Sequence, residues 1–264
     1  MVFDETAITR EIIKSYNDKL LDNINSDVLI VGAGPSGLVA GYYLSKAGYK
    51  TVIVEKRLST GGGIWGGGMA MNEIVIQKKA VPLAEDFGVS MRETTNDDLF
   101  SLDAMELASA LTLGAIKSGV TIFNLTCAED VCVSEQRVTG VVVNRTNIYG
   151  ALPVDPLMLK SRAVLDATGH EAAILQCLRK HGYKIFSTTG QMVGEGAMDP
   201  AAGERFVEER ACEIYQGLYV SGMAVCAAFG GPRMGPIFGG MLLSGKRIAS
   251  LIEKNIKTAQ KQEE

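Results

Sequence analysis

The chain has 264 residues, 47% of them hydrophobic and 21% charged, which excludes a disordered protein and a coiled coil. Its 26 Lys and Arg and 30 Asp and Glu give a net charge of −4, and the basic residues form no cluster, so no nucleic-acid partner is expected. The apolar runs are too short to span a membrane and the first residues form no signal-peptide core, so we expect a cytoplasmic protein without a membrane partner.

The first elements follow from the spacing of apolar residues. Isoleucine, tyrosine and leucine residues recur at helical spacing over residues 5–24, which predicts an amphipathic N-terminal helix. An apolar strand at 27–31, a helix at 38–47 and a strand at 51–54 follow it. Together the two strands and their connecting helix predict a βαβ unit.

The rest of the chain continues to alternate between helices and strands. The predicted elements are a glycine-rich loop at 61–68, a helix at about 101–118, strands at 120–125, 131–134 and 138–144, a strand at 162–166, a helix at about 171–181, a strand at 217–223, a helix at 238–254, and a frayed polar tail at 255–264. We therefore expect a single α/β domain over residues 1–264 with its core at about 25–254. Its fold class is Rossmann-like and of the flavoprotein type (glutathione reductase-like), with a parallel sheet and an inserted antiparallel meander.

The glycine motif GAGPSG at 32–37 has the context of a dinucleotide-binding fingerprint, because it follows an apolar strand and opens a helix. Gly32 permits the turn, Gly34 lets the backbone approach a pyrophosphate, and Gly37 allows close packing of helix and strand. Glu55 lies about 20 residues later at the end of the next strand, where its carboxylate can accept hydrogen bonds from ribose hydroxyls. A glycine turn that binds nothing is the alternative.

A position near the C-terminus distinguishes FAD from NAD. Flavoproteins of this fold carry a Gly-Asp pair there that holds the ribityl chain of FAD, whereas this chain has Gly222-Met223. A thioether is a weak hydrogen-bond acceptor and cannot replace a carboxylate. A dinucleotide without a ribityl chain, such as NAD, is therefore favoured.

Longer motifs resemble the thiamine thiazole synthase family over nearly the whole chain. They are VGAGPSG (31–37), GGGIWGGGM (61–69), VDP (154–156), DATGH (166–170) and RMGPIFGGMLLSG (233–245). The resemblance implies an enzyme of thiamine biosynthesis that joins the ADP-ribose part of its substrate NAD to glycine and a sulfur atom. Nicotinamide is released, and an adenylated thiazole carboxylate is formed in this pentosyl transfer. The resemblance also implies Fe(II) as cofactor and a homo-octamer with sites shared between protomers.

One departure from the family pattern concerns the source of sulfur. Eukaryotic members carry a cysteine two residues before the aspartate of the VDP motif, and this cysteine gives up its own sulfur. The archaeal branch commonly has histidine there and uses free sulfide. This chain has Pro153, which has no sulfur to give, so the resemblance implies a catalytic, sulfide-dependent enzyme.

The resemblance assigns catalytic and metal-binding roles to Asp155 and His170, drawn from neighbouring protomers. Imidazole and carboxylate ligands suit ferrous iron when open positions remain for substrate. An Asp-Pro turn is the alternative role for Asp155, and a residue at a helix start is the alternative for His170.

The remaining site residues are also implied by the resemblance. NAD contacts are assigned to Gly34, Ser36, Glu55, Lys56, Gly63, Cys127, Pro153, Val154, Asp155 and Met223. Arg233 is assigned to the carboxylate of glycine, because a guanidinium can clamp a carboxylate with two hydrogen bonds. Three of these residues have a structural alternative: Arg233 as a surface residue, Cys127 as a packing group, and Lys56 as a solvated charge.

The sequence is also compatible with three other functions. Fold analogy alone allows an ordinary FAD- or NAD-dependent oxidoreductase. The fingerprint alone allows a dinucleotide-binding protein without catalysis. A sugar-phosphate isomerase that uses an ADP-ribose-like site is the third.

Overall fold

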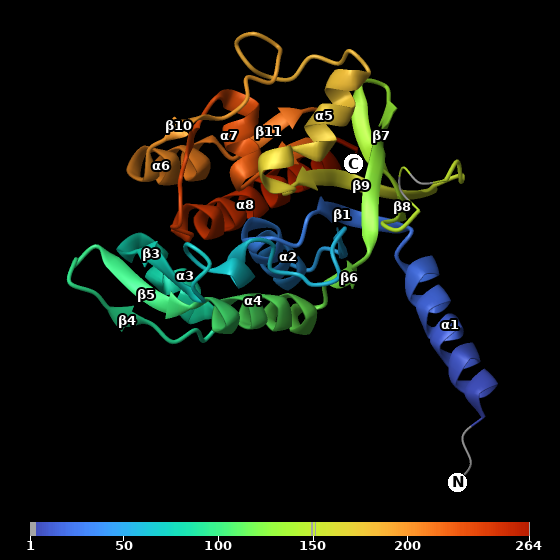
Figure 1. Ribbon diagram of the computed structural model, residues 1–264. Coiled ribbons are helices and arrows are strands. Elements are labelled where there is room, and N and C mark those ends of the chain that lie inside the picture. The colour runs from blue at the N-terminus through green and yellow to red at the C-terminus, as the bar shows by residue number, and fades with distance from the viewer. Residues whose placement is uncertain (1–3, 149, 151, 264) are drawn as a thin grey trace.

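The computed structural model describes residues 4–148, 150 and 152–263 (Figure 1). The helices are α1 (Glu5–Asp22), α2 (Pro35–Lys46), α3 (Val81–Asp86), α4 (Ala104–Ser118), α5 (Ala173–Lys180), α6 (Pro200–Arg210), α7 (Met223–Phe229) and α8 (Gly239–Glu263). The strands are β1 (Asn25–Val31), β2 (Thr51–Val54), β3 (Glu73–Gln77), β4 (Arg92–Glu93), β5 (Leu99–Asp103), β6 (Thr121–Phe123), β7 (Thr126–Ser134), β8 (Arg137–Arg145), β9 (Leu157–Asp166), β10 (Gly196–Met198), β11 (Cys212–Tyr215), β12 (Leu218–Val220) and β13 (Pro232–Arg233).

The main sheet is parallel at its centre, in the strand order β12-β9-β1-β2-β6. Strand β11 adds antiparallel to the β12 edge, and β7, β8 and β9 form an antiparallel meander. Strand β1 pairs with β2 from Val28–Thr51 to Val31–Val54, with α2 as the connection. The predicted α/β fold, its βαβ unit and the presence of an antiparallel meander are therefore confirmed, but the strand predicted at 120–125 is β6, which pairs parallel with β2 outside the meander.

The apolar strand sequences reflect burial on both faces of the sheet. The side chains of Leu29, Ile30, Val52 and Ile53 are fully buried. Helix α2 packs against both α4 and α8. The approach of α8 to α2 is close, since a Cβ on Gly245 would lie 2.5 Å from the carbonyl oxygen of Ser36. These contacts fix the N-terminus of α2, which is the end that faces the site described below.

Several predicted boundaries are wrong, for local reasons. The helix predicted from residue 101 begins at Ala104, where the carboxylate of Asp103 caps it by accepting from the Glu106 amide at 2.8 Å. Residues 99–103 instead form β5 of a small antiparallel sheet, β3-β5-β4. The strand predicted at 217–223 ends at Val220, because α7 begins at Met223. The tail predicted to fray from residue 255 is helical through Glu263.

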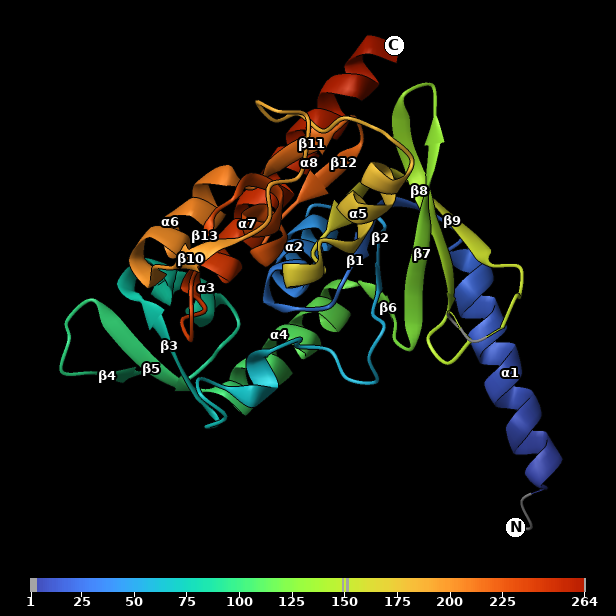
Figure 2. The same cartoon turned by 45° about the horizontal axis from the view of Figure 1, so that its top comes forward.

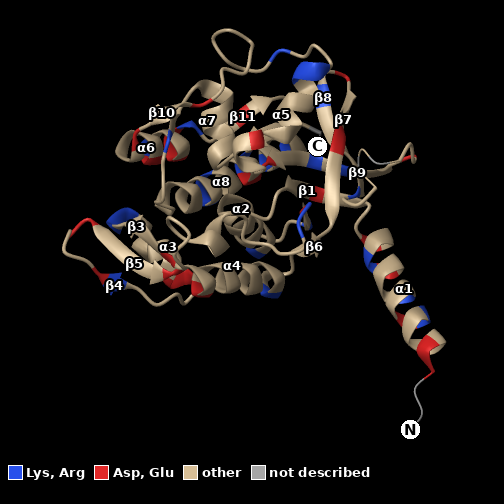
Figure 3. Ribbon diagram, in the orientation of Figure 1, with Lys and Arg blue, Asp and Glu red and all other residues tan. Residues whose placement is uncertain are grey.

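Helix α1 extends away from the rest of the molecule, as Figures 1 and 2 both show. It has the predicted amphipathic spacing, but none of its residues is buried. Its exposed apolar side chains are Ile8, Ile12, Ile13, Tyr16 and Leu21. Figure 3 shows that Lys and Arg alternate with Asp and Glu along this helix. Among the described residues, no helix is long and apolar enough to cross a membrane.

The buried carboxyl group of Glu204, on α6 against the start of α8, should make the stability of the protein depend on pH. Glu204 on α6 is 5% exposed, and its Oε2 accepts from the Gly240 amide at 2.5 Å. Its Oε1 has no hydrogen-bond partner within residues 4–148, 150 and 152–263. Burial raises the pKa of Glu204 to about 7. Between the ordinary glutamate pKa of about 4.3 and this value, the folded protein therefore holds a proton that the unfolded chain has released.

This shift contributes stability that is fully present below the ordinary glutamate pKa of about 4.3 and is lost as the pH rises through about 7. We expect up to about 3 kcal/mol of unfolding free energy to be lost across this window, as measured by urea unfolding. Glu204→Gln keeps an oxygen for the Gly240 amide and should flatten this dependence. An unchanged pH slope in the variant would remove Glu204 as its cause.

Candidate active site

A cavity of about 710 Å³ opens where the parallel strands β1, β2 and β9 end. Its walls include Gly32 after β1, Glu55 after β2 and Thr168 after β9. The start of β7 contributes Cys127, and the segment before α8 contributes Arg233. Ligands of open α/β sheets bind in this crevice beyond the carboxyl ends of the strands.

The predicted fingerprint has the geometry of a phosphate-binding loop. Gly32 has a φ of +102°, and a Cβ there would lie 2.5 Å from the carbonyl oxygen of Ala167. A Cβ on Gly37 would lie 2.1 Å from the carbonyl oxygen of Gly32, so helix and strand approach as closely as predicted. A Cβ on Gly34 would meet nothing within 4 Å. Because Gly34, Pro35 and Ser36 line the cavity, the N-terminus of α2 presents its amides and positive dipole end to a ligand.

A second glycine loop lies against the first. Gly61 donates its amide hydrogen to the Ala33 carbonyl at 2.7 Å, and a Cβ on Gly62 would lie 3.1 Å from the Cα of Gly34. Gly62 and Gly63 both line the cavity, so the predicted site residue Gly63 lies on its wall. The two loops together bring the glycines Gly34, Gly62 and Gly63 to one part of the cavity wall.

Glu55 holds the phosphate loop to the end of β2. Its carboxylate is buried, with Oε2 accepting from the Ala33 amide and Oε1 from the Arg57 amide, each at 2.8 Å. Each carboxylate oxygen has a second lone pair, so Glu55 can accept from a ribose hydroxyl while it keeps both bonds. The residue therefore combines a structural role, which the sequence did not reveal, with a place on the cavity wall.

His170 and Arg233 lie on the same cavity and share a partner. The Nδ1 of His170 is 2.5 Å from Oε1 of Glu195, and the Nε of Arg233 is 3.8 Å from Oε2 of the same carboxylate. Both cavity residues are largely exposed, whereas the side chain of Glu195 is only 18% exposed. Sequence reasoning missed Glu195, although an acid between Gly194 and Gly196 was a visible signal.

Lys56 and Cys127 line the cavity next to the end of β2 and at the start of β7. Lys56 forms a solvent-exposed ion pair of 2.6 Å with Glu171, and both residues line the cavity. Burial raises the pKa of the Cys127 thiol, which the nearby Lys56 ammonium only partly opposes. A neutral thiol is a poor nucleophile, so Cys127 fits the predicted packing role.

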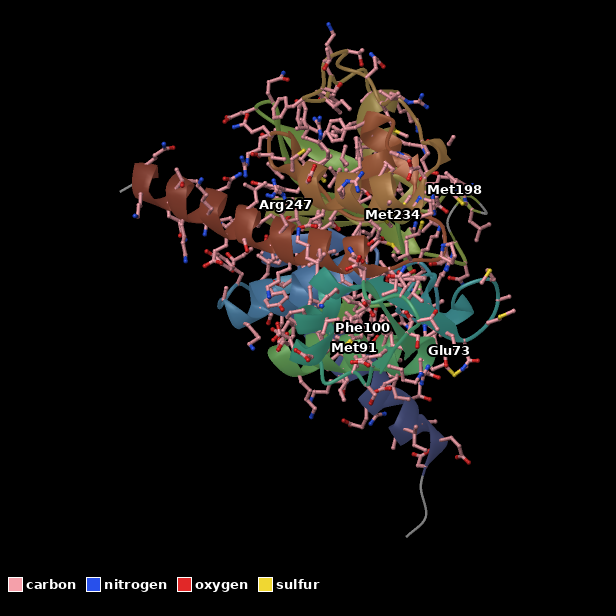
Figure 4. All side chains as sticks on the ribbon, turned by 90° about the vertical axis from the view of Figure 1, so that its left-hand side faces the viewer. Glu73, Met91, Phe100, Met198, Met234 and Arg247 are labelled. Carbon is pink, nitrogen blue, oxygen red and sulfur yellow. The ribbon has the colours of Figure 1, made fainter. Side chains whose placement is uncertain are left out.

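The C-terminal wall is apolar where a flavoprotein would place an acid. Met223 lines the cavity as the first residue of α7, directly after Gly222. Met234 also lines it and is almost fully buried. Figure 4 shows Met234 and Met198 on the same side of the molecule, where β10 pairs with β13. The wall therefore offers thioethers and backbone, as the sequence predicted for Met223.

Three predicted site residues lie apart from the cavity. Pro153, Val154 and Asp155 are exposed in the segment that enters β9, and none of them is among the residues of the cavity wall. His170 follows the far end of β9, which is a strand of 10 residues. At about 3.3 Å per residue the two ends of such a strand lie about 30 Å apart. One chain therefore does not bring Asp155 and His170 together.

The metal-binding potential of a single chain is small. Within the described part of the chain, no group of three or more His, Cys, Asp or Glu side chains is placed to hold an ion. His170 is the histidine on the cavity wall, and its Nδ1 is held by a carboxylate, as is usual for a metal-binding histidine.

Comparison with known proteins identifies the family. The Thi4 family profile matches residues 9–238. Thiamine thiazole synthase of Pyrococcus horikoshii is 46% identical over 96% of this chain and 99% of its own length. The enzyme of the same name from Methanothermobacter thermautotrophicus is 44% identical over 97% of this chain and its full length. The chain belongs to the Thi4 family.

Solved structures agree with this assignment. The crystal structure of Thermovibrio ammonificans THI4 superposes with a TM-score of 0.94 at 43% identity, over 97% of this chain and all of that one. A geranylgeranyl bacteriochlorophyll reductase-like protein of Thermoplasma acidophilum shares the fold alone, with a TM-score of 0.58 at 16% identity over 89% of this chain and 79% of that one. The predicted resemblance is thus confirmed, and thiamine thiazole synthesis is favoured over the oxidoreductase and isomerase alternatives.

Proposed function

We propose that this Thi4 family member is an iron-dependent, sulfide-dependent thiazole synthase that uses NAD and glycine as substrates. The observation that supports the proposal is one cavity whose wall combines the glycine loop at the start of α2, the Glu55 carboxylate, the His170 imidazole and the Arg233 guanidinium. The reaction releases nicotinamide and forms an adenylated thiazole carboxylate.

NAD would lie along the carboxyl ends of β1 and β2 and the start of β7. The amides at the start of α2 bind the pyrophosphate beside Gly34, and Glu55 accepts from the adenosine ribose. The negative charge of Glu55 would repel a 2′-phosphate, so the site should prefer NAD to NADP. The nicotinamide ribose would then point toward His170 and Arg233.

Arg233 would bind the carboxylate of glycine. Its contact with Glu195 is through Nε, which does not use the two terminal nitrogens of the guanidinium. Those nitrogens can form two parallel hydrogen bonds to a carboxylate, which would hold glycine in the same cavity as NAD.

Arg233→Lys tests this assignment. Lysine keeps the charge but loses the planar fork, so we expect the KM for glycine to rise about 10- to 100-fold, which corresponds to the loss of a charged hydrogen bond, while the Kd for NAD stays the same. The control is Arg92→Lys on the small β3-β5-β4 sheet, whose arginine pairs with Glu73 outside the cavity. Equal KM values for glycine in both variants would exclude Arg233 from the glycine site.

The iron site fits these residues only if two chains contribute to it. His170 supplies an oriented imidazole on the cavity wall, and Asp155 would come from a second copy because about 30 Å of strand separates the two within one chain. Iron bound there would supply a Lewis acid and a template for sulfide. The exposed apolar face of α1 gives a second copy a surface to cover, in agreement with the proposed homo-octamer.

The sulfur must come from outside the chain. Pro153 has none to give, and the cavity residue Cys127 is held as a neutral thiol by burial. The deciding experiment incubates the protein anaerobically with NAD, glycine, sulfide and Fe(II), with mass spectrometry of the product. More than one equivalent of adenylated thiazole per subunit is expected. A yield that stops at one equivalent with sulfide in excess would contradict the proposal.

A further inference from the structure

Behind the cavity wall lies a carboxylate that touches both of the wall's functional side chains. Glu195 does not itself line the cavity, but His170 and Arg233 do, and each contacts a different oxygen of its carboxylate. We infer that Glu195 is a positioning residue that fixes the tautomer and orientation of His170. This inference rests on the proposed role of His170 and adds a residue to that site.

The backbone around Glu195 is held in place on both sides. The Gly194 amide donates to the carbonyl of Ala227 at 2.9 Å, and the Gly196 amide donates to the carbonyl of Gly231 at 2.8 Å. Strand β10, which begins at Gly196, pairs with the strand that carries Arg233. A carboxylate on such a segment is fixed relative to Arg233 before any ligand binds, and this is what a positioning role requires.

The contact chemistry selects one tautomer of His170. An ionised carboxylate only accepts hydrogen bonds, so an oxygen 2.5 Å from Nδ1 requires a proton on Nδ1. In the neutral imidazole, Nε2 then carries the free lone pair, which is the atom available to a metal ion or to a substrate proton.

The second histidine provides an internal control. His181 contacts the carboxylate of Asp130 through Nε2, at 2.7 and 2.8 Å. By the same argument His181 carries its proton on Nε2, so the only two histidines of the chain should be opposite tautomers. Long-range ¹H–¹⁵N NMR of the imidazole rings reads both tautomers in one spectrum of the whole protein.

The test compares the wild type with three variants at about pH 8, above the ordinary histidine pKa of about 6.5. Glu195→Ala removes the acceptor and should shift only His170 toward the Nε2-protonated form. Glu195→Gln keeps an acceptor oxygen and should restore the Nδ1-protonated form. Asp130→Ala should change only His181. Turnover should fall about 10- to 100-fold in Glu195→Ala, as for other residues behind metal-binding histidines, and recover in Glu195→Gln.

Two results would overturn the inference. The first is a wild-type His170 that carries its proton on Nε2. The second is a Glu195→Ala variant in which the tautomer of His170 is unchanged while His181 keeps its wild-type signals. The wild-type spectrum is a test that requires no variant to fold. It also requires neither substrate nor iron. A wrong tautomer therefore overturns the role of Glu195 and leaves thiazole formation standing, whereas the expected tautomer without thiazole formation supports the role and overturns the proposed function.

Discussion

Replacing Gly37 by alanine should destabilise the protein by about 3 kcal/mol or more, whereas replacing Gly34 by alanine should change its stability by less than about 1 kcal/mol. The new Cβ of Gly37→Ala would lie 2.1 Å from the carbonyl oxygen of Gly32 and 3.2 Å from the Cβ of Ala167. Because the nearest atom belongs to the backbone, the first strand and α2 must move apart. Gly34 has a φ of −77° and open space beside its Cα, so alanine fits there without strain.

For NAD binding by the folded protein the order should be reversed, with the larger effect in Gly34→Ala. The open space beside Gly34 is where the pyrophosphate would lie, so a methyl group there should weaken NAD binding at least about tenfold, or about 1.4 kcal/mol. Urea unfolding gives the stabilities, and calorimetric titration gives the Kd for NAD. If Gly34→Ala binds NAD as the wild type does, the phosphate loop is not the binding site. If Gly37→Ala is as stable as the wild type, the close packing of α2 is not essential.

The parts of the fold that could be predicted are those with a strong local pattern. Strand β1 is an apolar run bounded by the fingerprint, and α2 starts at a proline and ends near a glycine. The apolar run of α7, MAVCAAF, is equally suited to a buried strand or a buried helix, so periodicity could not reveal it. The polar residues after 254 form helix because Ile256 still packs in the core.

The site residues divide in the same way: those placed by the local sequence could be predicted, and those placed by long-range contacts could not. Residues shortly after the ends of strands, such as Glu55 and His170, could be placed on the cavity because parallel strands end at one edge. Glu195 could not be placed, since its contacts with His170 and Arg233 join three separate segments. The position of Asp155 at the other end of β9 also depends on strand length, which was predicted as 162–166 and is Leu157–Asp166.

His170→Ala and Asp155→Ala should each abolish turnover, the largest effect that we expect on activity. Both residues are exposed, so Asp155→Ala should keep the stability of the wild type within about 0.5 kcal/mol, and His170→Ala, which also loses the contact with Glu195, within about 1.5 kcal/mol. Neither belongs to the phosphate loop, so much of the NAD affinity should remain. Product is measured anaerobically by mass spectrometry with sulfide in excess, because iron and sulfide together are sensitive to oxygen. Normal turnover in either variant would remove that residue from the site.

Co-expression of the two inactive chains tests whether the site is shared. Because β9 separates Asp155 from His170 by about 30 Å within a chain, a working site should take one residue from each of two chains. A mixed oligomer then contains sites with the intact histidine of one chain and the intact aspartate of its neighbour, about a quarter of all sites for random assembly. Turnover should therefore return to about a quarter of the wild-type value. If the mixture stays as inactive as the separate variants, although mass spectrometry shows mixed oligomers, Asp155 and His170 do not form a site between chains.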